Sequence, residues 1–246
     1  MGLAHAANGD NYAAKRCYDH AITLQKNLIV EASDVKHRID LALSQNNLGL
    51  LMLHSGDTKE AETVLRQSIA SLSKVVQEHQ DHVLANRGLA AALTSLSSIT
   101  VNTAPDHATA LLEEAIDCQL RIHKSAPSQL KASSEIANTY NTLGATKLTE
   151  NSISEAIDAF AHAIDLHRKV HEIAPSVSSY QIDLATSLNN IASARFRQGQ
   201  YTSAIRAARE AIQLQLTCLK RSPRDPASSK RLAVMYSNLA APLAAL

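Results

Sequence analysis

Aromatic side chains are scarce in this 246-residue chain. They make up 3% of the residues, with no Trp and two Phe, so a hydrophobic interior must be built mostly from Leu, Ile and Ala. Small side chains of this kind suit helices that pack closely together. Cysteine is also sparse, and neither its odd count nor its wide spacing indicates a disulfide framework or a zinc cluster. The three residues are Cys17, Cys118 and Cys218.

Long hydrophobic runs are missing as well. No apolar stretch approaches the ~18 residues that would indicate a membrane span. The opening residues, MGLAHAANGD, lack the charged region followed by an apolar run that marks a secretory signal. These features predict a cytoplasmic protein without a membrane partner.

Motifs of catalysis and cofactor binding are absent from the sequence. It contains no Gly-rich phosphate loop, no nucleophile elbow and no kinase catalytic loop, so we expect no catalytic residue, no cofactor and no enzyme activity. His167 and His171 stand four apart, a spacing at which two imidazoles on one helix can share a metal ion. However, the Glu of the HExxH pattern is missing, and Arg168 and Lys169 lie between the two histidines. We therefore expect no metal site.

The chain is dominated by an internal repeat. An Ile or Leu followed by Ala recurs with spacings of 48, 47, 48 and 48 residues. The doublets are Leu41-Ala42, Leu89-Ala90, Ile136-Ala137, Leu184-Ala185 and Leu232-Ala233. Repeats of fixed period indicate a solenoid, in which units that cannot bury their own apolar faces stack on one another. Such stacking predicts an extended binding surface and not a closed pocket.

Each period contains two amphipathic segments. In the first, apolar residues recur at intervals of four and three, as at Leu184, Leu188 and Ile191, which is typical of one stripe of an α-helix. In the second, small residues follow the same rhythm, as at Ala204 and Ala208. The sequence therefore predicts an all-α fold. The expected helices are 34–55, 57–79, 82–102, 105–124, 129–149, 152–173, 177–198 and 200–221.

Short turns separate these segments. A Gly often follows the first helix, where a left-handed residue can end it. A Pro often follows the second helix, with a Ser or Asp placed to cap the next one. The glycines are Gly9, Gly56 and Gly199, the prolines are Pro127, Pro175 and Pro223, and the expected caps are Ser128, Ser176 and Asp225.

A short run ending in Gly or Ala marks the first helix of several periods. The runs are Asn47-Leu48-Gly49, Thr142-Leu143-Gly144 and Asn190-Ile191-Ala192. Together with the Gly of the turn and with Ala61 and Leu65 of the second helix, they resemble the tetratricopeptide repeat. That family's usual period is about 34 residues, so both helices are lengthened here. The long period resembles arrays appended to bacterial serine/threonine protein kinases, whereas the kinesin light chain has a similar signature with a shorter period.

The resemblance implies an α-α superhelix of antiparallel helix pairs. We expect a single domain, 1–246, with about five repeats. Their approximate bounds are 1–33 (partial), 34–80, 81–127, 128–175, 176–224 and 225–246 (partial).

The resemblance also implies a concave groove lined by the first helix of each repeat, which would bind a protein or peptide. An Asn ladder along it could grip the backbone of an extended peptide, because the amide both donates and accepts hydrogen bonds. The alternative is that these Asn residues only join adjacent helices. The residues expected in the groove are Leu43, Asn46, Leu50, Leu53, Asn138, Asn141, Leu148, Asn189, Phe196 and Arg197.

The charge distribution and the chain ends raise further possibilities. From Arg195 onward there are nine Lys or Arg against Glu210 and Asp225, giving 9 − 2 = +7, which could steer an acidic partner. We do not expect nucleic-acid binding, because these cations are more typical of a solvated outer face. The apolar residues 239–246 suggest self-association through uncapped ends. The sequence thus predicts a protein-interaction scaffold. Its rivals are a regulatory segment of a larger bacterial kinase or other enzyme, and a structural spacer.

Overall fold

A computed structural model describes residues 11–31, 34–125, 129–223 and 225–245 of the chain. These residues form helices and short turns, with no strand among them. The helices are α2 (Asn11–Glu31), α3 (Val35–Ser55), α4 (Thr58–Glu78), α5 (Val83–Thr100), α6 (Pro105–Ser125), α7 (Leu130–Thr149), α8 (Ile153–Ile173), α9 (Ser178–Arg197), α10 (Tyr201–Arg221) and α11 (Pro226–Ala244). The predicted all-α fold is confirmed, and the eight predicted helices agree with α3–α10 to within two residues at each end.

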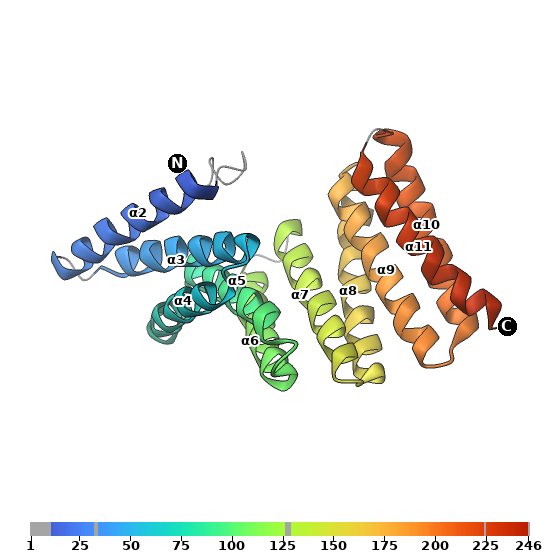
Figure 1. Cartoon of the computed structure of the whole chain (residues 1–246), viewed down its shortest axis with the longest axis horizontal. Coiled ribbons are helices and arrows are strands. Elements are labelled where there is room, and N and C mark those ends of the chain that lie inside the picture. Colours follow the sequence, from blue (N-terminus) through green and yellow to red (C-terminus); the bar gives the residue numbers. More distant parts are fainter. Residues whose placement is uncertain (1–10, 32–33, 126–128, 224, 246) are drawn as a thin grey trace. The chain divides into compact units, whose positions relative to one another are not determined.

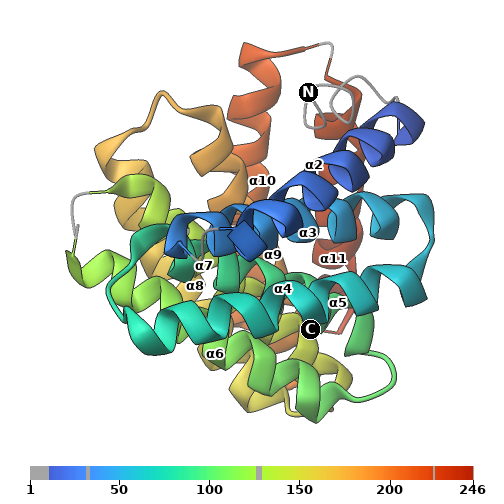
Figure 2. The same cartoon turned by 90° about the vertical axis from the view of Figure 1, so that its left-hand side faces the viewer.

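The chain divides into two compact units, Met1–Ala126 and Pro127–Leu246. Helices α2–α6 belong to the first unit and α7–α11 to the second. Within each unit, consecutive helices pack side by side and reverse direction at each turn (Figure 1). In the first unit, α3 lies between α2 and α4 (Figure 2). We call α3, α5, α7, α9 and α11 first helices, and α2, α4, α6, α8 and α10 second helices, after their place in the repeat.

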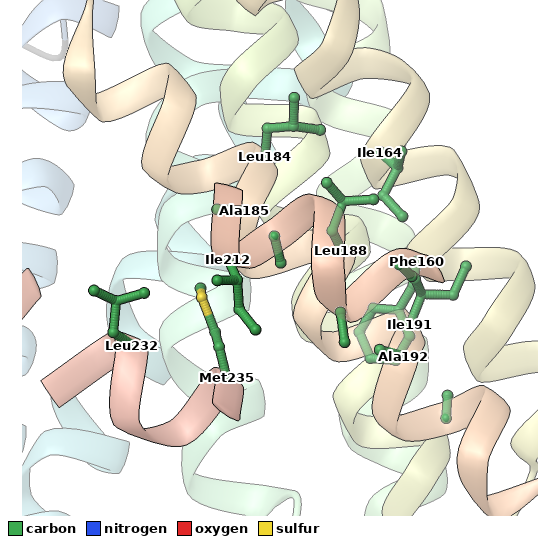
Figure 3. Close-up of a cluster of buried hydrophobic side chains, with 14 of the residues drawn as sticks. Phe160, Ile164, Leu184, Ala185, Leu188, Ile191, Ala192, Ile212, Leu232 and Met235 are labelled. Carbon is green, nitrogen blue, oxygen red and sulfur yellow. The ribbon is translucent and has the colours of Figure 1, made fainter. Parts of the chain in front are cut away.

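The interior of the second unit is built mostly from aliphatic residues and Ala, as expected from the composition. Phe160, Ile191 and Ala192 gather on one side of this core, and Leu232 and Met235 on another (Figure 3). All five are at most 7% exposed. Full burial of one large apolar side chain stabilises the folded state by about 1.5–3 kcal/mol. The repeats are therefore held together by burial between neighbouring helices.

A left-handed residue stands in three of the turns between a first and a second helix. Gly56 and Gly199 have φ of 88° and 79°, as expected for glycines that end a helix. Asn151 takes this place in the third repeat, with φ of 61°. Asn151 is not among the predicted turn residues, although Asn tolerates this conformation better than other non-glycine residues. Gly9 and Pro127 lie outside the described residues.

The predicted caps differ in outcome. Asp225 caps α11, because its carboxylate accepts a hydrogen bond of 3.0 Å from the backbone N–H of Ala227. The prediction for Ser176 was wrong: α9 begins after Val177, with no side-chain cap. Ser128 lies outside the described residues. No helix in the described part of the chain is both long and apolar enough to cross a membrane.

Candidate peptide-binding groove

The first helices of the second unit carry the predicted groove residues of the third and fourth repeats. Asn138 on α7 and Arg197 at the end of α9 are exposed. Leu148 is half-buried and packs against the hydrophobic core. Phe196 is also half-buried, and its ring lies against Tyr201 with centroids 5.8 Å apart. Both apolar side chains pack against residues of the second unit, so only part of their surface is open to a partner.

Two of the predicted groove Asn residues join successive first helices. Asn141 Nδ2 on α7 donates to Ser187 Oγ on α9 at 2.6 Å. Asn189 Oδ1 on α9 accepts from Asn238 Nδ2 on α11 at 3.0 Å. Both residues therefore make the interhelical contacts considered as the alternative to ligand binding. Among the described residues no hydrogen bond is made by Asn189 Nδ2, so this group can still donate to a ligand.

The predicted groove residues of the first unit are largely engaged in packing. Leu43 Cδ2 would lie 2.7 Å from a Cβ added to Gly88, so Leu43 sits closely against α5. Asn46 is 5% exposed, and its side chain is not presented on the surface. Leu50 is half-buried, and Leu53 packs against the cluster that α3 forms with α2. The open apolar groove expected at α3 is thus filled in large part by the protein itself.

A hollow of about 340 Å³ lies between α9 and α11 in the second unit. It is lined by Thr186, Asn189, Ala227, Lys230, Arg231, Val234 and Met235. Thr186 and Val234 each stand two residues after the Leu of their doublet, so they occupy the same place in successive repeats. No α11 residue is among the predicted groove residues, because the last repeat is predicted to be partial. The repeat spacing alone places Val234 at the position of Thr186 and could have identified it. Val234 is 50% exposed.

The rim of this hollow is basic. Lys230 is exposed and forms no ion pair with any described residue. Arg231 lies 3.0 Å from Asp225, so its charge is partly balanced. The Ser228 hydroxyl and the Arg231 guanidinium hold the pKa of Asp225 below its usual range, which keeps this carboxylate charged. No acidic side chain lines the hollow itself.

A buried polar cluster lies between α7, α8 and α9. His167 Nδ1 on α8 is 2.9 Å from Ser187 Oγ, which also donates to the carbonyl of Asp183 at 3.0 Å. His167 and Ser187 are both 0% exposed, and burial lowers the pKa of His167 to about 4. A Ser–His pair can act as a nucleophile and its base. Here both side chains are fully buried, and the cluster joins α7, α8 and α9.

The two histidines that suggested a metal site are placed differently. His167 is fully buried, whereas His171 is half-buried one turn later on α8. Among the described residues, no three His, Cys, Asp or Glu side chains lie close enough together to hold a metal ion.

Two segments of the chain, residues 41–83 and 184–217, match the family model described as tetratricopeptide repeat. These two segments are similar to tetratricopeptide repeats. Each matched segment begins in a first helix and extends into its second helix. The tetratricopeptide repeat is a general scaffold fold for protein–protein interactions. A comparison with curated proteins gives no match.

Solved structures show the same fold at low sequence identity. BtubC (BKLC) from P. vanneervenii is 16% identical, with a TM-score of 0.63 over 94% of this chain and 85% of that one. A Podosopora anserina protein named after kinesin light chain, with nearly identical TPR-like repeats, is 18% identical, with a TM-score of 0.58 over 91% and 94%. A thermophilic TPR protein from Thermus thermophilus is 16% identical, with a TM-score of 0.51 over 96% and 95%. The tetratricopeptide-repeat superhelix is therefore confirmed as the fold.

Proposed function

We propose that this chain is a protein-interaction scaffold that binds a peptide segment of a partner along the first helices of its second unit. The observation that supports this most directly is the hollow between α9 and α11. Its volume of about 340 Å³ lies at the lower end of the ~300–1,000 Å³ typical of ligand pockets. Val234 is exposed within it, and burial of this surface by a partner would stabilise the complex.

The lining residues indicate which peptide fits. Val234 and Met235 favour an apolar side chain in the hollow, and Asn189 Nδ2 can donate to a backbone carbonyl of an extended peptide. Lys230 at the rim favours a carboxylate next to the apolar anchor, because no acidic lining residue competes for it. The partner proposed is therefore a peptide with an apolar anchor flanked by acidic residues.

The proposal can be tested by selecting binders from a random 12-residue peptide library against the full chain. We expect selected peptides to lose at least tenfold in affinity for Val234→Asp, which places a charge in the apolar hollow. The matched control is Val177→Asp, because Val177 is another exposed Val but lies before α9, outside the hollow. Selected peptides that bind both variants as tightly as the original protein would contradict the proposal, as would a selection without binders.

The purely structural role considered from the sequence makes the opposite prediction. In a spacer, Val234→Asp, Lys230→Glu and Phe196→Ala would change no binding. Lys230→Glu is the more informative variant for specificity. We expect it to weaken peptides with an acidic flank more than neutral ones, and this difference should shrink as the salt concentration rises.

A further inference from the structure

Another hollow of the second unit lies on the side of α9 that faces away from the proposed groove. Its volume is about 210 Å³, and it is lined by residues of α8, α9 and α10. On α9 the groove is lined by Thr186 and Asn189, whereas this hollow is lined by Leu188, Ile191 and Arg195. An α-helix turns by about 100° per residue, so the two sets lie on opposite faces of α9. Because three arginines line it, we call it the arginine hollow.

The floor of the arginine hollow is apolar. Ile164 of α8 and Leu188 of α9 lie side by side in it (Figure 3), and Ala207 of α10 lines it as well. All three residues are at most 7% exposed. Water shields a charge beside such a floor less well than it shields a charge on an open surface. A charged ligand group would therefore interact more strongly here than with isolated surface side chains.

Five charged side chains line the hollow above this floor. Arg168 on α8 donates to Glu210 on α10 at 2.9 Å, so these two charges balance one another. Of the other three, Arg195 and Arg206 are cationic and Asp165 is anionic. None of these three forms an ion pair with any described residue. The arginine hollow therefore keeps two unpaired guanidinium groups against one unpaired carboxylate.

The preceding repeat has a cation at the register of Arg195, and there it is neutralised. This cation is Lys147 on α7. It lies 2.9 Å from the carboxylate of Glu150 and 3.0 Å from that of Glu155. The residues one period after these two acids carry no charge, and they are Gln198 and Ser203. The fourth repeat has thus kept the cation and lost both of its acidic partners.

The second unpaired cation reverses a charge of the preceding repeat. Arg206 stands one period after Asp158, an exposed acid on α8. At these four registers the third repeat therefore carries 1 − 3 = −2, whereas the fourth carries +2. The third repeat forms the same helix pair with the opposite charge, so packing of the helices does not require the two unpaired arginines. A ligand of negative charge accounts for them.

We propose that the arginine hollow binds the phosphate group of a phosphate monoester between Arg195 and Arg206. A guanidinium donates paired hydrogen bonds whose geometry matches phosphate oxygens. A phosphate monoester carries about −1.5 to −2 charge at pH 7 and three acceptor oxygens, which suits two guanidiniums better than the single charge of a carboxylate does. The volume is below the ~300–1,000 Å³ of ordinary ligand pockets, so the hollow accepts the phosphate and its nearest carbon atoms only.

The first test titrates inorganic phosphate into the full chain at constant ionic strength and follows the arginine Nε–H signals by NMR. We expect the signals of Arg195 and Arg206 to shift saturably, with a dissociation constant of about 1 mM or tighter, as for two hydrogen bonds to charged groups. Acetate should bind more weakly than phosphate. The absence of a saturable shift in the millimolar range overturns the proposal, as does acetate binding as tight as that of phosphate.

Substitutions separate the site from the general positive charge of α10. Arg195→Gln and Arg206→Gln should each weaken phosphate binding by about tenfold or more. The matched control is Arg209→Gln, because Arg209 is another exposed arginine of α10 but does not line the arginine hollow. Arg209→Gln should leave the binding unchanged. Equal weakening by all three variants overturns the proposal, because these cations would then be an ordinary solvated face.

Two further variants leave both arginines in place. Gln198→Glu/Ser203→Glu gives the fourth repeat the acids that neutralise Lys147 in the third, and it should abolish phosphate binding without lowering the stability to urea. Asp165→Asn removes the opposing carboxylate and should tighten binding several-fold, which a damaged fold cannot do. Unchanged binding in both variants contradicts the proposal.

The source of the phosphate group is identified by a second probe, a blocked alanine peptide with one central phosphoserine. If this peptide binds more tightly than inorganic phosphate and its unphosphorylated form does not bind, the site takes a phosphorylated side chain of a partner. If the phosphopeptide and inorganic phosphate bind equally, the site takes a free phosphate monoester. Equal binding of the phosphorylated and unphosphorylated peptides overturns the proposal.

Discussion

A Cβ atom added to Gly144 on α7 would lie 2.6 Å from Cε1 of Phe160 on α8. Phe160 is 1% exposed, so its ring has little room to move aside. This contact lets the two helices of the third repeat approach closely around a large aromatic side chain. In the fourth repeat the same two registers hold Ala192 and Ala208, so both helices carry a small side chain there.

Gly144→Ala should therefore destabilise the protein. Ala is the better helix former by about 1 kcal/mol, but overpacking of a close core contact costs typically ~1–3 kcal/mol. We expect a net loss of up to about 2 kcal/mol in the free energy of unfolding, and a larger loss for Gly144→Arg, both measured by urea denaturation. Lys169→Gln, an exposed change on α8, is the control and should lie within about 0.5 kcal/mol of the original protein.

The coupling between the two residues can be measured directly. In the double variant Gly144→Ala/Phe160→Ala the added methyl group no longer meets a ring. We expect this variant to lose less stability than the two single changes together, by about 0.5–3 kcal/mol. Strict additivity would show that the close contact does not limit packing at Gly144.

The stability of the protein should fall as the pH drops from about 6.5 to about 4 because of His167. Burial lowers its pKa in the folded state to about 4, whereas an unfolded His has a pKa of about 6.5. In this window the unfolded state binds the extra proton, so the free energy of unfolding decreases with falling pH, by on the order of 3 kcal/mol in full. Thermal or urea unfolding at several pH values measures this slope.

His167→Gln isolates that contribution, because Gln does not titrate. Gln215 stands at the same register on α10, is 0% exposed and donates to Ser228 Oγ at 3.0 Å, so a Gln fits this kind of site. Burial raises the pKa of Asp183, which has the opposite effect, but this carboxyl is present in both proteins. An unchanged pH slope in His167→Gln would mean that His167 does not titrate as its burial implies.

Asn151 should tolerate glycine but not alanine. Its φ of 61° is left-handed. For residues other than Gly, Asn or Asp, this conformation costs about 1–2 kcal/mol of conformational energy. We expect Asn151→Ala to lower the free energy of unfolding by about 1 kcal/mol and Asn151→Gly to change it by less than about 0.5 kcal/mol. Asn102, an exposed Asn in the corresponding turn of the second repeat, lacks a positive φ. Equal losses for Asn102→Ala and Asn151→Ala would refute the conformational explanation.

Ser187→Ala should destabilise the second unit. The Ser187 hydroxyl accepts from Asn141 Nδ2 and lies 2.9 Å from His167 Nδ1. Its removal leaves buried polar groups without a partner, which costs about 1–3 kcal/mol. Ser193 on the same helix is half-buried and forms no hydrogen bond through its side chain with any described residue, so Ser193→Ala is a matched control. Chemical denaturation of both variants distinguishes a local polar requirement from a general loss at α9.

The helices were predictable because their causes are local. The rhythm of Leu184, Leu188 and Ile191 fixes one helical face, and the turn residues bound it, so α9 begins and ends within a residue of its predicted place. Asn151 shows the limit of this reasoning. Its left-handed turn follows from its register with Gly56 and Gly199 and not from its residue type alone.

The groove was less predictable, because exposure depends on neighbours far away in the sequence. Asn46, Asn141 and Asn189 share one register, yet Asn46 is buried, Asn141 meets Ser187 and Asn189 meets Asn238. The binding role of the groove residues stays a prediction, as do the cytoplasmic location, the bacterial origin and the association with a kinase.

The sequence by itself determined the helices, their pairing and the repeat, because hydrophobic periodicity and turn residues act within a few residues of each position. Only the tertiary structure decided which side chains stay open to a partner. The side chain of Leu188 is covered and that of Tyr236 is bare at the same register, because α10 lies over α9 and no described helix lies over that face of α11.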